Sequence, residues 1–589
     1  LADYRGVLFA GNDSAEKDLA SDHQEAAPGL ELAYYLYRDP NYIPIIRNAK
    51  KRNLLYGVPN LPQTDWSPWA FSVCQDNSGF AVLRSQPETM QPRQRIQAVL
   101  KFGTHGGYHG HFDRASLMSL MRYGRSFYST EAAWYGYDSY LFKMWVQASV
   151  SHNMVVVDQR MQKPAEGKLL LFYPGRQIQA AAAETSSQWI DPPYGGQTPY
   201  RESFPQEKSW KESRYLPIPD VPRPQGDTGL PSEPVLQRRL MVVTQDYVIV
   251  ADFLKGSEEH TFDNLIHIKG LKDFHAAAKV FRNHTDQFSA DPFGAGQFIT
   301  NCDWYQVETP AVCRFQMDGP QAGGSGTLSE PGPLKMDVHL LWPQTAEMMV
   351  ADYPENLGTA KKLWYAVRAD GQTLAEGRFG AWILGADQID VALEGKTVLE
   401  LETRVDSLKN KTIFWAEAVI VTADGKEIPL TRLPLQYEGL IPTENFAQDY
   451  YGGKICIAGK PRDSAVGANP QKPNEPGLIR VNLSGLHASR LKAVIGGDYP
   501  LGPAADHRKT VSFRSRGSEA RFIMLIEPYE NDSVIAAVLS DGQMVKTELK
   551  DGRVQVLAFQ NLDGNPDQVQ VEFSEYSNGK RTFYEKAVK

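Results

Sequence analysis

The chain has 589 residues, of which 42% are hydrophobic and 22% charged, and its formal net charge at pH 7 is −8. This is an ordinary globular composition, which excludes extensive disorder or a fibrous structure, and at about 150 residues per domain the length predicts about three to four domains. The negative net charge argues against a protein that mainly coats nucleic acid, although it is compatible with a local basic cleft for an acidic ligand.

The N-terminal segment is predicted to be helical. The chain opens on Leu1 rather than on Met and has no signal-peptide pattern, which indicates a processed product or a partial chain. Residues 29–56 place apolar side chains at helical spacing, with a break at Asp39-Pro40 and a resumed period from Ile45 to Leu55. We therefore expect one pair of helices before about residue 66.

From about residue 66 onward, short apolar runs alternate with turn residues, which is typical of β-strands. The clearest runs are 81–84, 98–101, 154–157, 169–172, 363–368, 389–393, 398–402, 479–483 and 491–495, and a hairpin is predicted from Arg239–Thr244 to Tyr247–Ala251. Strands at this spacing over several hundred residues predict large β-sandwiches. No run approaches the roughly 18 apolar residues that a membrane-spanning helix needs.

Two local features leave alternatives open. Residues 184–235 are rich in Pro, Gly and aromatic residues, so they form either a disordered loop or an ordered flap, and the aromatic residues favour the flap. Cys302 and Cys313 flank a predicted strand-turn-strand, which allows a hairpin disulfide or, as the favoured alternative, two buried thiols. The chain has four cysteines and no CxxC motif, so neither a disulfide scaffold nor a cysteine zinc site is supported.

The histidines are concentrated in one region. Four of the twelve lie between residues 105 and 152, three of them in the glycine-rich segment 103–114, which reads GTHGGYHGHFDR. His109 and His111 are two residues apart, so on an extended strand they face the same side. A metal ion relieves the repulsion of two adjacent imidazoles by binding one in its neutral form, and the glycines leave the backbone open to a ligand. The alternative is a solvated His-rich turn.

This region resembles the heparinase II/III-like polysaccharide lyases. In that family a Gly-rich His-Gly-His-x-Asp segment is followed by a Gly-Arg turn, a Tyr-rich loop and a Ser-His-Asn segment before a Val-Val-Val-Asp strand. The counterparts here, in the same order, are His109-Gly-His111-Phe-Asp113, Gly124-Arg125, Trp134-Tyr-Gly-Tyr137, Ser151-His152-Asn153 and Val155-Val-Val-Asp158. The resemblance covers roughly residues 1–355 and 504–589.

The resemblance implies a mainly β fold, with a large antiparallel β-sandwich after a short α-helical segment. Residues 1–65 would be the end of an α/α-toroid, 66–355 the central β-sandwich lyase domain, and 504–589 a C-terminal sheet that completes the sandwich. Residues 356–503 resemble an inserted galactose-binding-like jelly-roll module whose halves, 389–418 and 449–500, stand in reversed order. Such a module either binds sugar or serves as a spacer.

By resemblance, the protein is a polysaccharide lyase that cleaves uronic-acid-containing polysaccharide by β-elimination. His109 takes the position of the catalytic histidine, and the candidate substrate contacts are His105, Tyr135, Tyr137 and Asn153. The catalytic Tyr of the family would lie upstream of Leu1, so a preceding toroid segment, a second subunit or a local tyrosine would supply it. The implied partner is an acidic polysaccharide, without nucleic acid or membrane, and the implied location is periplasmic or secreted.

The family's metal site also has a counterpart. That site uses the second His of His-Gly-His, an Asp after the Gly-Arg turn and the His of His-Asn. His111 and His152 match, whereas Ser129-Thr130 stands at the Asp position and Glu131 is the expected substitute. With a water molecule, these three ligands would complete a tetrahedral structural Zn²⁺ site. A metal-free, hydrogen-bonded pair of histidines is the alternative.

Two other function classes are weighed against the lyase. A non-catalytic carbohydrate-binding protein on a lyase-like scaffold would account for the short helical segment and for the missing Asp. A glycoside hydrolase needs two carboxylates flanking a cleft, whereas the motif region is rich in histidine, so this class ranks last. The pattern is equally compatible with a glycosaminoglycan, alginate, ulvan or a glucuronate-bearing plant glycan as substrate.

Overall fold

The computed structural model describes residues 3–4, 6–9, 11, 17–18, 26–48, 52–53, 55–63, 71–86, 90–103, 110–126, 145–190, 233–291, 294–317, 333–353, 363–379, 386–405, 413–442, 455–457, 460–497 and 508–589. Within these residues two α-helices accompany many strands, and the strand pairs are antiparallel. The predicted mainly β fold is therefore confirmed. No helix among the described residues is both long and apolar enough to cross a membrane.

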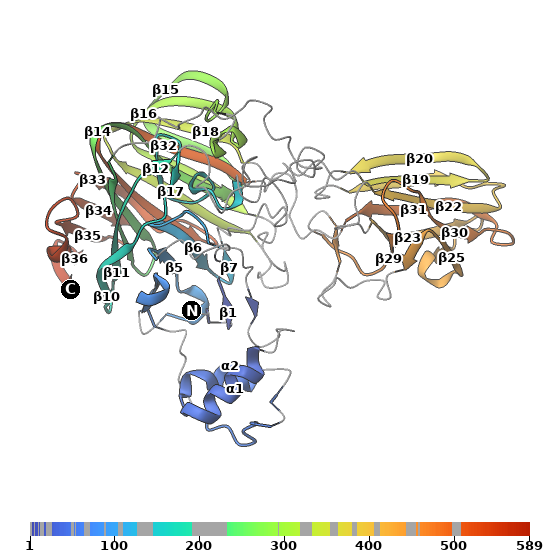
Figure 1. The fold of residues 1–589 in the computed structure, drawn as a ribbon, viewed down its shortest axis with the longest axis horizontal. Helices are drawn as coiled ribbons and strands as arrows, with labels where there is room; N and C mark the ends of the chain where they lie inside the picture. Colours follow the sequence, from blue (N-terminus) through green and yellow to red (C-terminus); the bar gives the residue numbers. More distant parts are fainter. Residues whose placement is uncertain are drawn as a thin grey trace.

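The two helices are α1 (Ala26–Tyr37) and α2 (Ile43–Asn48), which lie together at one end of the molecule (Figure 1). They pack through a small apolar cluster that includes Tyr34 and Ile46. The predicted helix break is confirmed: Asp39 caps the short 3₁₀ helix η1 (Pro40–Tyr42), and its carboxylate accepts a hydrogen bond from the backbone N–H of Asn41.

The second helix is shorter than predicted. Residues 52 and 53 lie outside it, because the buried carboxylate of Glu31 in α1 binds this part of the chain as a loop. That carboxylate accepts hydrogen bonds from the Arg52 side chain and from the backbone N–H groups of Asn53 and Val58. A tertiary contact thus overrides the helical periodicity that continued to residue 55.

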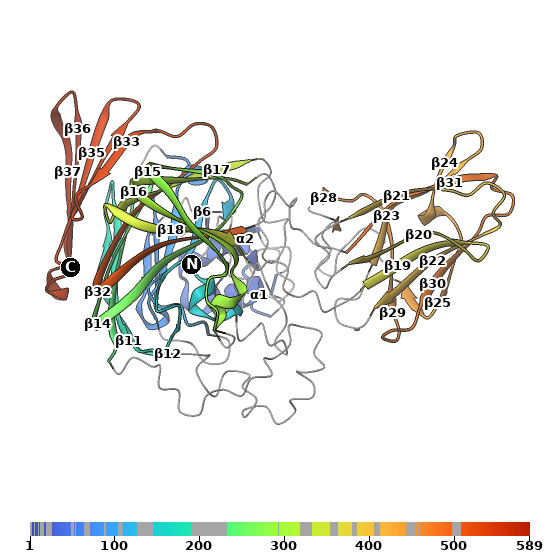
Figure 2. The same cartoon turned by 90° about the horizontal axis from the view of Figure 1, so that it is seen from above.

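A large antiparallel sheet forms the middle layer of the larger body, on the left in Figures 1 and 2. Its strands, in spatial order, are β10 (Gly167–Pro174), β11 (Gln179–Ser187), β13 (Val235–Val243), β14 (Val248–Lys269), β32 (Arg508–Tyr529), β17 (Leu334–Trp342), β16 (Thr300–Met317) and β15 (Leu271–Gln287), with β18 (Thr345–Asp352) paired to β16 and β32, and β8 (Val155–Val157) paired to β14. The predicted hairpin is confirmed, because β13 and β14 pair in register from Val243 and Val248. Strand β32 returns the chain to this sheet after residue 507.

A smaller sheet covers one face of the large sheet. Its strands are β3 (Val73–Gln75), β4 (Phe80–Arg84), β5 (Gln97–Lys101), β6 (Ser116–Arg122) and β7 (Arg125–Ser126). The core between the two sheets includes Leu83 and Leu100 from the small sheet and Met241 and Val250 from the large one. The candidate site lies at the edge of this core.

The opposite face is covered by the C-terminal sheet of β33 (Ile535–Ser540), β34 (Met544–Leu549), β35 (Arg553–Gln560), β36 (Gln570–Ser577) and β37 (Lys580–Ala587). Successive residues of β14 therefore enter two different cores: Val248 and Val250 face the small sheet, whereas Ile249 and Ala251 face the C-terminal sheet. Burial of both faces explains why the central strands read as continuous apolar runs.

The described residues between 363 and 497 build a separate two-sheet body, which stands beside the large sheet in both views (Figures 1 and 2). One sheet contains β20 (Gln372–Phe379), β19 (Leu363–Ala369), β22 (Val398–Val405), β30 (Gly477–Asn482) and β25 (Leu435–Glu438); the other contains β21 (Asp387–Ala392), β31 (Ala488–Gly496), β23 (Ile413–Thr422), β29 (Ala465–Pro470), β26 (Leu440–Pro442) and β24 (Glu427–Pro429). The strands predicted here are confirmed. The domain boundaries and the jelly-roll assignment remain proposals.

Short two-stranded ladders complete the described fold: β1 (Val7–Leu8) with β2 (Lys17–Asp18), β9 (Met161–Gln162) with β12 (Trp189–Ile190), and β27 (Cys456–Ile457) with β28 (Lys460–Pro461). Most of the predicted flap, residues 191–232, lies outside the described residues. The expected turn between Cys302 and Cys313 is wrong. Both residues lie in the single strand β16 as free, buried thiols, so the thiol alternative holds.

Candidate active site at a buried histidine pair

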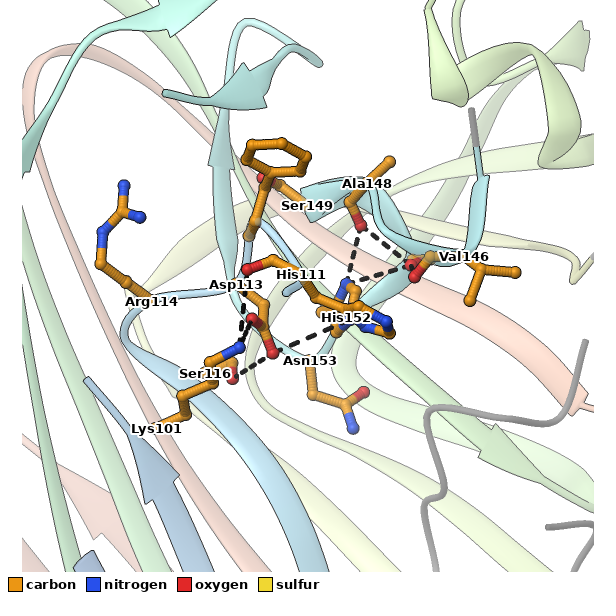
Figure 3. Close-up of polar contacts among 12 residues, drawn as sticks. Lys101, His111, Asp113, Arg114, Ser116, Val146, Ala148, Ser149, His152 and Asn153 are labelled. Atoms are coloured by element: carbon orange, nitrogen blue, oxygen red, sulfur yellow. Dashed lines mark hydrogen bonds and ion pairs between the residues drawn. The ribbon is translucent and has the colours of Figure 1, made fainter. Parts of the chain in front are cut away.

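The described part of the histidine motif forms a buried polar cluster at the edge of the small sheet (Figure 3). Lys101 is the last residue of β5, and His111 and Asp113 lie in the segment that leads into β6. His152 follows the 3₁₀ helix η7 (Ser149–Ser151), just before β8. The four residues are at most 2% exposed, so each polar atom depends on protein partners.

The imidazoles of His111 and His152 face one another. Nδ1 of His111 lies 2.9 Å from Nε2 of His152. Nδ1 of His152 lies 2.7 Å from the carbonyl oxygen of Ala148 and 3.0 Å from Oγ of Ser151. Because a carbonyl only accepts, Nδ1 of His152 carries the proton, and its Nε2 offers a lone pair to the partner ring. Burial lowers the pKa of His152 to about 4, so this ring is neutral at pH 7.

Asp113 and Lys101 form an ion pair directly beside the histidines. The Lys101 ammonium contacts Oδ1 of Asp113 and lies 3.5 Å from the carbonyl oxygen of His111. Oδ2 of Asp113 lies 3.7 Å from Nε2 of His152 and 3.4 Å from Oγ of Ser116. Burial alone would raise the pKa of Asp113, but the Lys101 charge and the neighbouring histidines outweigh it and hold that pKa well below its usual range. The carboxylate is therefore ionised and fixed in place.

Two anchors hold the ends of the glycine-rich loop. At the start, the backbone N–H groups of Phe102 and Gly103 donate to the carbonyl of Gly79, at 2.7 and 3.0 Å. At the end, the N–H of Phe112 donates to the carbonyl of Gln147 at 2.9 Å, and the Ser149 hydroxyl donates to the Phe112 carbonyl. The intervening residues 104–109 are outside the described part of the chain, but the positions where they begin and end are fixed.

The contact between Gly79 and Gly103 predicts that one methyl group added at Gly79 strongly destabilises the protein. Gly79 has φ +70°, and a Cβ there would lie 1.9 Å from Cα of Gly103. We expect Gly79→Ala to lower the free energy of unfolding by several kcal/mol, from backbone strain and overpacking together. Gly371→Ala is the matched control, because Gly371 has φ +79° but no atom within 4 Å of the added Cβ, so it should cost only about 1 kcal/mol. Urea denaturation measures the free energy of unfolding of both variants. Equal decreases in the two variants would contradict the close contact between Gly79 and Gly103.

A second layer of hydrogen bonds fixes the segment around His152. The side-chain oxygen of Asn153 accepts from the backbone N–H of His267 at 2.7 Å, and its carbonyl accepts from Arg239 at 2.8 Å. Arg239 also forms a two-pronged ion pair with Asp252. The His267 ring lies 2.9 Å from the carbonyl of Val150, and its other nitrogen 3.0 Å from Oγ1 of Thr510. Strands β13, β14 and β32 thereby hold η7 and the residues after it.

The structure brings together two of the predicted site residues, His111 and His152. Asn153 lies next to them in the chain, but its side chain points away from the pair (Figure 3), and its role as a substrate contact stays a prediction. The other predicted site residues lie outside the described part of the chain: His105, His109, Glu131, Tyr135 and Tyr137. No sequence motif marks the roles of Lys101, Arg239 and His267, because each role is defined by a partner on another part of the fold. For Asp113, the motif itself was the available signal.

The donor set of the pair fits a zinc ion. Two nitrogens bound to one tetrahedral Zn²⁺ lie about 3.3 Å apart, and the facing nitrogens here are 2.9 Å apart, so a shift of a few tenths of an ångström opens the site. The carbonyl of Ala148 holds the far nitrogen of His152, which is the outer-shell arrangement that metal-binding histidines use. The predicted third ligand, Glu131, is not among the described residues. The Asp113 carboxylate lies 3.7 Å from Nε2 of His152.

Comparisons with known proteins give structural likenesses only. No family model and no curated protein matches the sequence. Among solved structures, 99% of the chain aligns with a heparinase III gene product at 12% identity and a TM-score of 0.41, covering 50% of that protein. It aligns likewise with a heparan sulfate lyase from Pedobacter heparinus (10% identity, TM-score 0.34, 99% and 50% covered) and with a heparinase III (10%, 0.33, 100% and 52%). The chain spans about half the length of these proteins.

Proposed function

We propose that this protein is a polysaccharide lyase that cleaves uronic-acid-containing polysaccharide by β-elimination. The observation that carries the proposal is the fixed cluster of Lys101, His111, Asp113 and His152 at the foot of the glycine-rich loop. Burying an ion pair and two histidines is costly and gives little net stability, so this arrangement is better explained by the loop geometry that it maintains. The loop carries His105 and His109, in the order of the lyase motif.

β-Elimination makes three demands on the protein. The uronate carboxylate must be neutralised so that the proton on C5 becomes acidic, a base must remove that proton, and an acid must protonate the departing O4. In the proposed roles, His109 faces the uronate carboxylate or assists proton transfer. His105, Tyr135, Tyr137 and Asn153 contact the substrate, and a tyrosine serves as base and acid. That tyrosine comes from residues upstream of Leu1, from a second subunit or from the chain itself.

The experiment is a lyase assay on a panel of acidic polysaccharides, followed by the rise in ultraviolet absorbance as the unsaturated uronate forms. The protein should include any native residues upstream of Leu1. We expect at least one uronate polymer to be cleaved and neutral glucans to be left intact. Cleavage of none of a broad panel would reject the proposal. A periplasmic or secreted location, where such polymers are encountered, belongs to the same proposal.

We also propose that His111 and His152, with Glu131 as third ligand, hold a structural Zn²⁺ ion. The ion would supply a fixed positive charge that ties the loop to the segment before β8. We expect His111→Ala and His152→Ala each to lose one equivalent of zinc in elemental analysis of gently purified protein, and His275→Ala, at an exposed histidine of β15, to retain it. If Glu131→Ala retains the metal, only the third ligand is wrong. Wild type without any metal would support the hydrogen-bonded pair instead.

A specific observation favours the second hypothesis, a carbohydrate-binding protein. On the outer face of the β20–β19–β22 sheet, Trp364 lies between Arg378 and Arg404 on the neighbouring strands, with guanidinium carbons 5.9 and 5.0 Å from its ring centre. Neither arginine forms an ion pair with another described residue. An aromatic ring flanked by two arginines matches a sugar that carries carboxylates or sulfates.

We predict that Trp364, Arg378 and Arg404 together bind acidic polysaccharide independently of catalysis. In affinity electrophoresis, the wild type should bind alginate but not the neutral polymer dextran. Trp364→Ala and the Arg378→Ala/Arg404→Ala double variant should each weaken alginate binding at least tenfold. Arg480→Ala is the matched control on the same face, because Arg480 is already paired with Glu400 and Glu438. If all variants bind alginate as tightly as the wild type does, Trp364, Arg378 and Arg404 are not the binding site. Alginate binding without cleavage of any polymer would make the binding protein the better function.

A further inference from the structure

A second cluster of metal-ligand residues lies on the other face of the large sheet. Asp337 and His339 are two residues apart in β17, so their side chains share one face. Glu527 of β32 stands directly opposite Asp337 in the strand register. One potential ligand atom from each residue lies within 4.8 Å of those from the other two.

This face is the one that packs against the C-terminal sheet. Leu341 and Leu525, which continue the same alternation, belong to the core with the C-terminal strands, whereas Val338 and Ile526 belong to the core with the small sheet. The histidine pair borders the latter core, since Phe112 belongs to it. The two clusters are therefore separated by the large sheet and do not share ligands.

The two carboxylates lack a close cation. Asp337 and Glu527 are buried, and the nearest ion-pair partner of Asp337 in the described structure is the half-exposed Arg314, at 3.8 Å. The Tyr529 hydroxyl donates to Asp337 at 3.1 Å. Two buried carboxylates side by side require either a bound proton or a cation.

The histidine distinguishes between these two solutions. Nε2 of His339 is buried and has no hydrogen-bond partner among the described residues. An imidazole nitrogen without a hydrogen-bond partner can offer its lone pair to a metal ion. A proton shared by the carboxyl groups would leave this ring unsatisfied, whereas a divalent cation would satisfy both carboxylates and the imidazole together.

We infer that Asp337, His339 and Glu527 form a binding site for a divalent transition-metal ion of the Zn²⁺ or Mn²⁺ class. One imidazole and two carboxylates are a ligand set that such ions accept, with water completing the coordination. The same Glu527 carboxylate accepts hydrogen bonds from Oγ of Ser533 at 2.7 Å and from the N–H of Val534 at 2.6 Å, directly before β33. A metal here would join β17 and β32 to the start of the C-terminal sheet.

The test is Zn²⁺ binding to the chelator-treated full chain, with the bound metal counted by elemental analysis and the thermal midpoint recorded with and without Zn²⁺. The Asp337→Asn/Glu527→Gln variant should bind one equivalent less than wild type and lose the part of the Zn²⁺-induced rise in midpoint that this site supplies. Asp303→Asn is the matched control, because Asp303 of β16 forms an exposed pair with His284 of β15. Its zinc count and midpoint shift should equal those of wild type.

The single variant His339→Ala keeps the experiment decisive if the double variant fails to fold, since His339 gives up no hydrogen bond to the described residues. Its affinity for Zn²⁺ at this site should fall at least tenfold. Unchanged zinc stoichiometry and unchanged affinity in this variant would overturn the inference. The readout is independent of lyase activity, and loss of the ion at His111 and His152 leaves the predicted difference between the variants intact.

Discussion

His109→Ala is expected to reduce lyase activity by about 30-fold to 1000-fold while the fold stays intact. In the sequence His109 stands two residues before His111 and next to Gly110, and the described residues on either side of this segment are anchored to the carbonyls of Gly79 and Gln147. Removal of one preorganised donor to a developing charge costs on the order of 2–4 kcal/mol of transition-state stabilisation. The measurement is kcat/KM on the polymer that the wild type cleaves best.

The matched control for this variant is His275→Ala. His275 is 60% exposed on β15 and should be dispensable for catalysis. Both variants should keep the wild-type thermal midpoint, so that a difference in rate reports on the site rather than on folding. If His109→Ala retains more than about a tenth of the wild-type rate, the role proposed for His109 is wrong.

Lys101→Met should cause the largest loss of stability among single substitutions at the site. The variant removes the ammonium that neutralises Asp113 and leaves an uncompensated, fully buried carboxylate. Breaking a buried pair in this way costs about 3–5 kcal/mol, whereas replacing both partners by apolar residues costs less. We therefore expect Lys101→Met/Asp113→Leu to recover part of the loss. Urea denaturation of the three proteins gives the free energies of unfolding.

An exposed ion pair supplies the reference for this experiment. Lys255 pairs with Glu519 at 2.5 Å between adjacent strands, but both side chains are at least half exposed. Because water screens such a pair, Lys255→Met should change the free energy of unfolding by no more than about 1 kcal/mol. Similar losses for Lys101→Met and Lys255→Met would show that the buried pair does not hold the site together.

Much of the fold could be predicted because its signals are local. The apolar runs Arg239–Thr244 and Tyr247–Ala251 predicted the β13–β14 hairpin, and Asp39-Pro40 predicted the break between the helices. Wrong predictions arose where distant contacts decide the structure. The end of α2 depends on Glu31, 21 residues before Arg52. The apparent turn before Cys313 is straightened by pairing with β15, β17 and β18.

The site could be predicted only in part for the same reason. Motif spacing identified His111 and His152, and their rings do lie together. The residues that hold them have no motif: His267 reaches Asn153 from 114 residues away, and Asp337 meets Glu527 only through strand register. Alternation within a strand predicts which side chains share a face, but it does not predict which strand lies alongside.

The measurement that tests the proposed function most directly is the mass of the cleavage products. The protein is incubated with a uronate polysaccharide of defined length, and all fragments are weighed by mass spectrometry. β-Elimination adds no water, so the fragment masses should sum to that of the substrate, with a double bond in the new terminal uronate. Fragment masses that sum to the substrate plus one water molecule per cut would identify a hydrolase and contradict the lyase proposal.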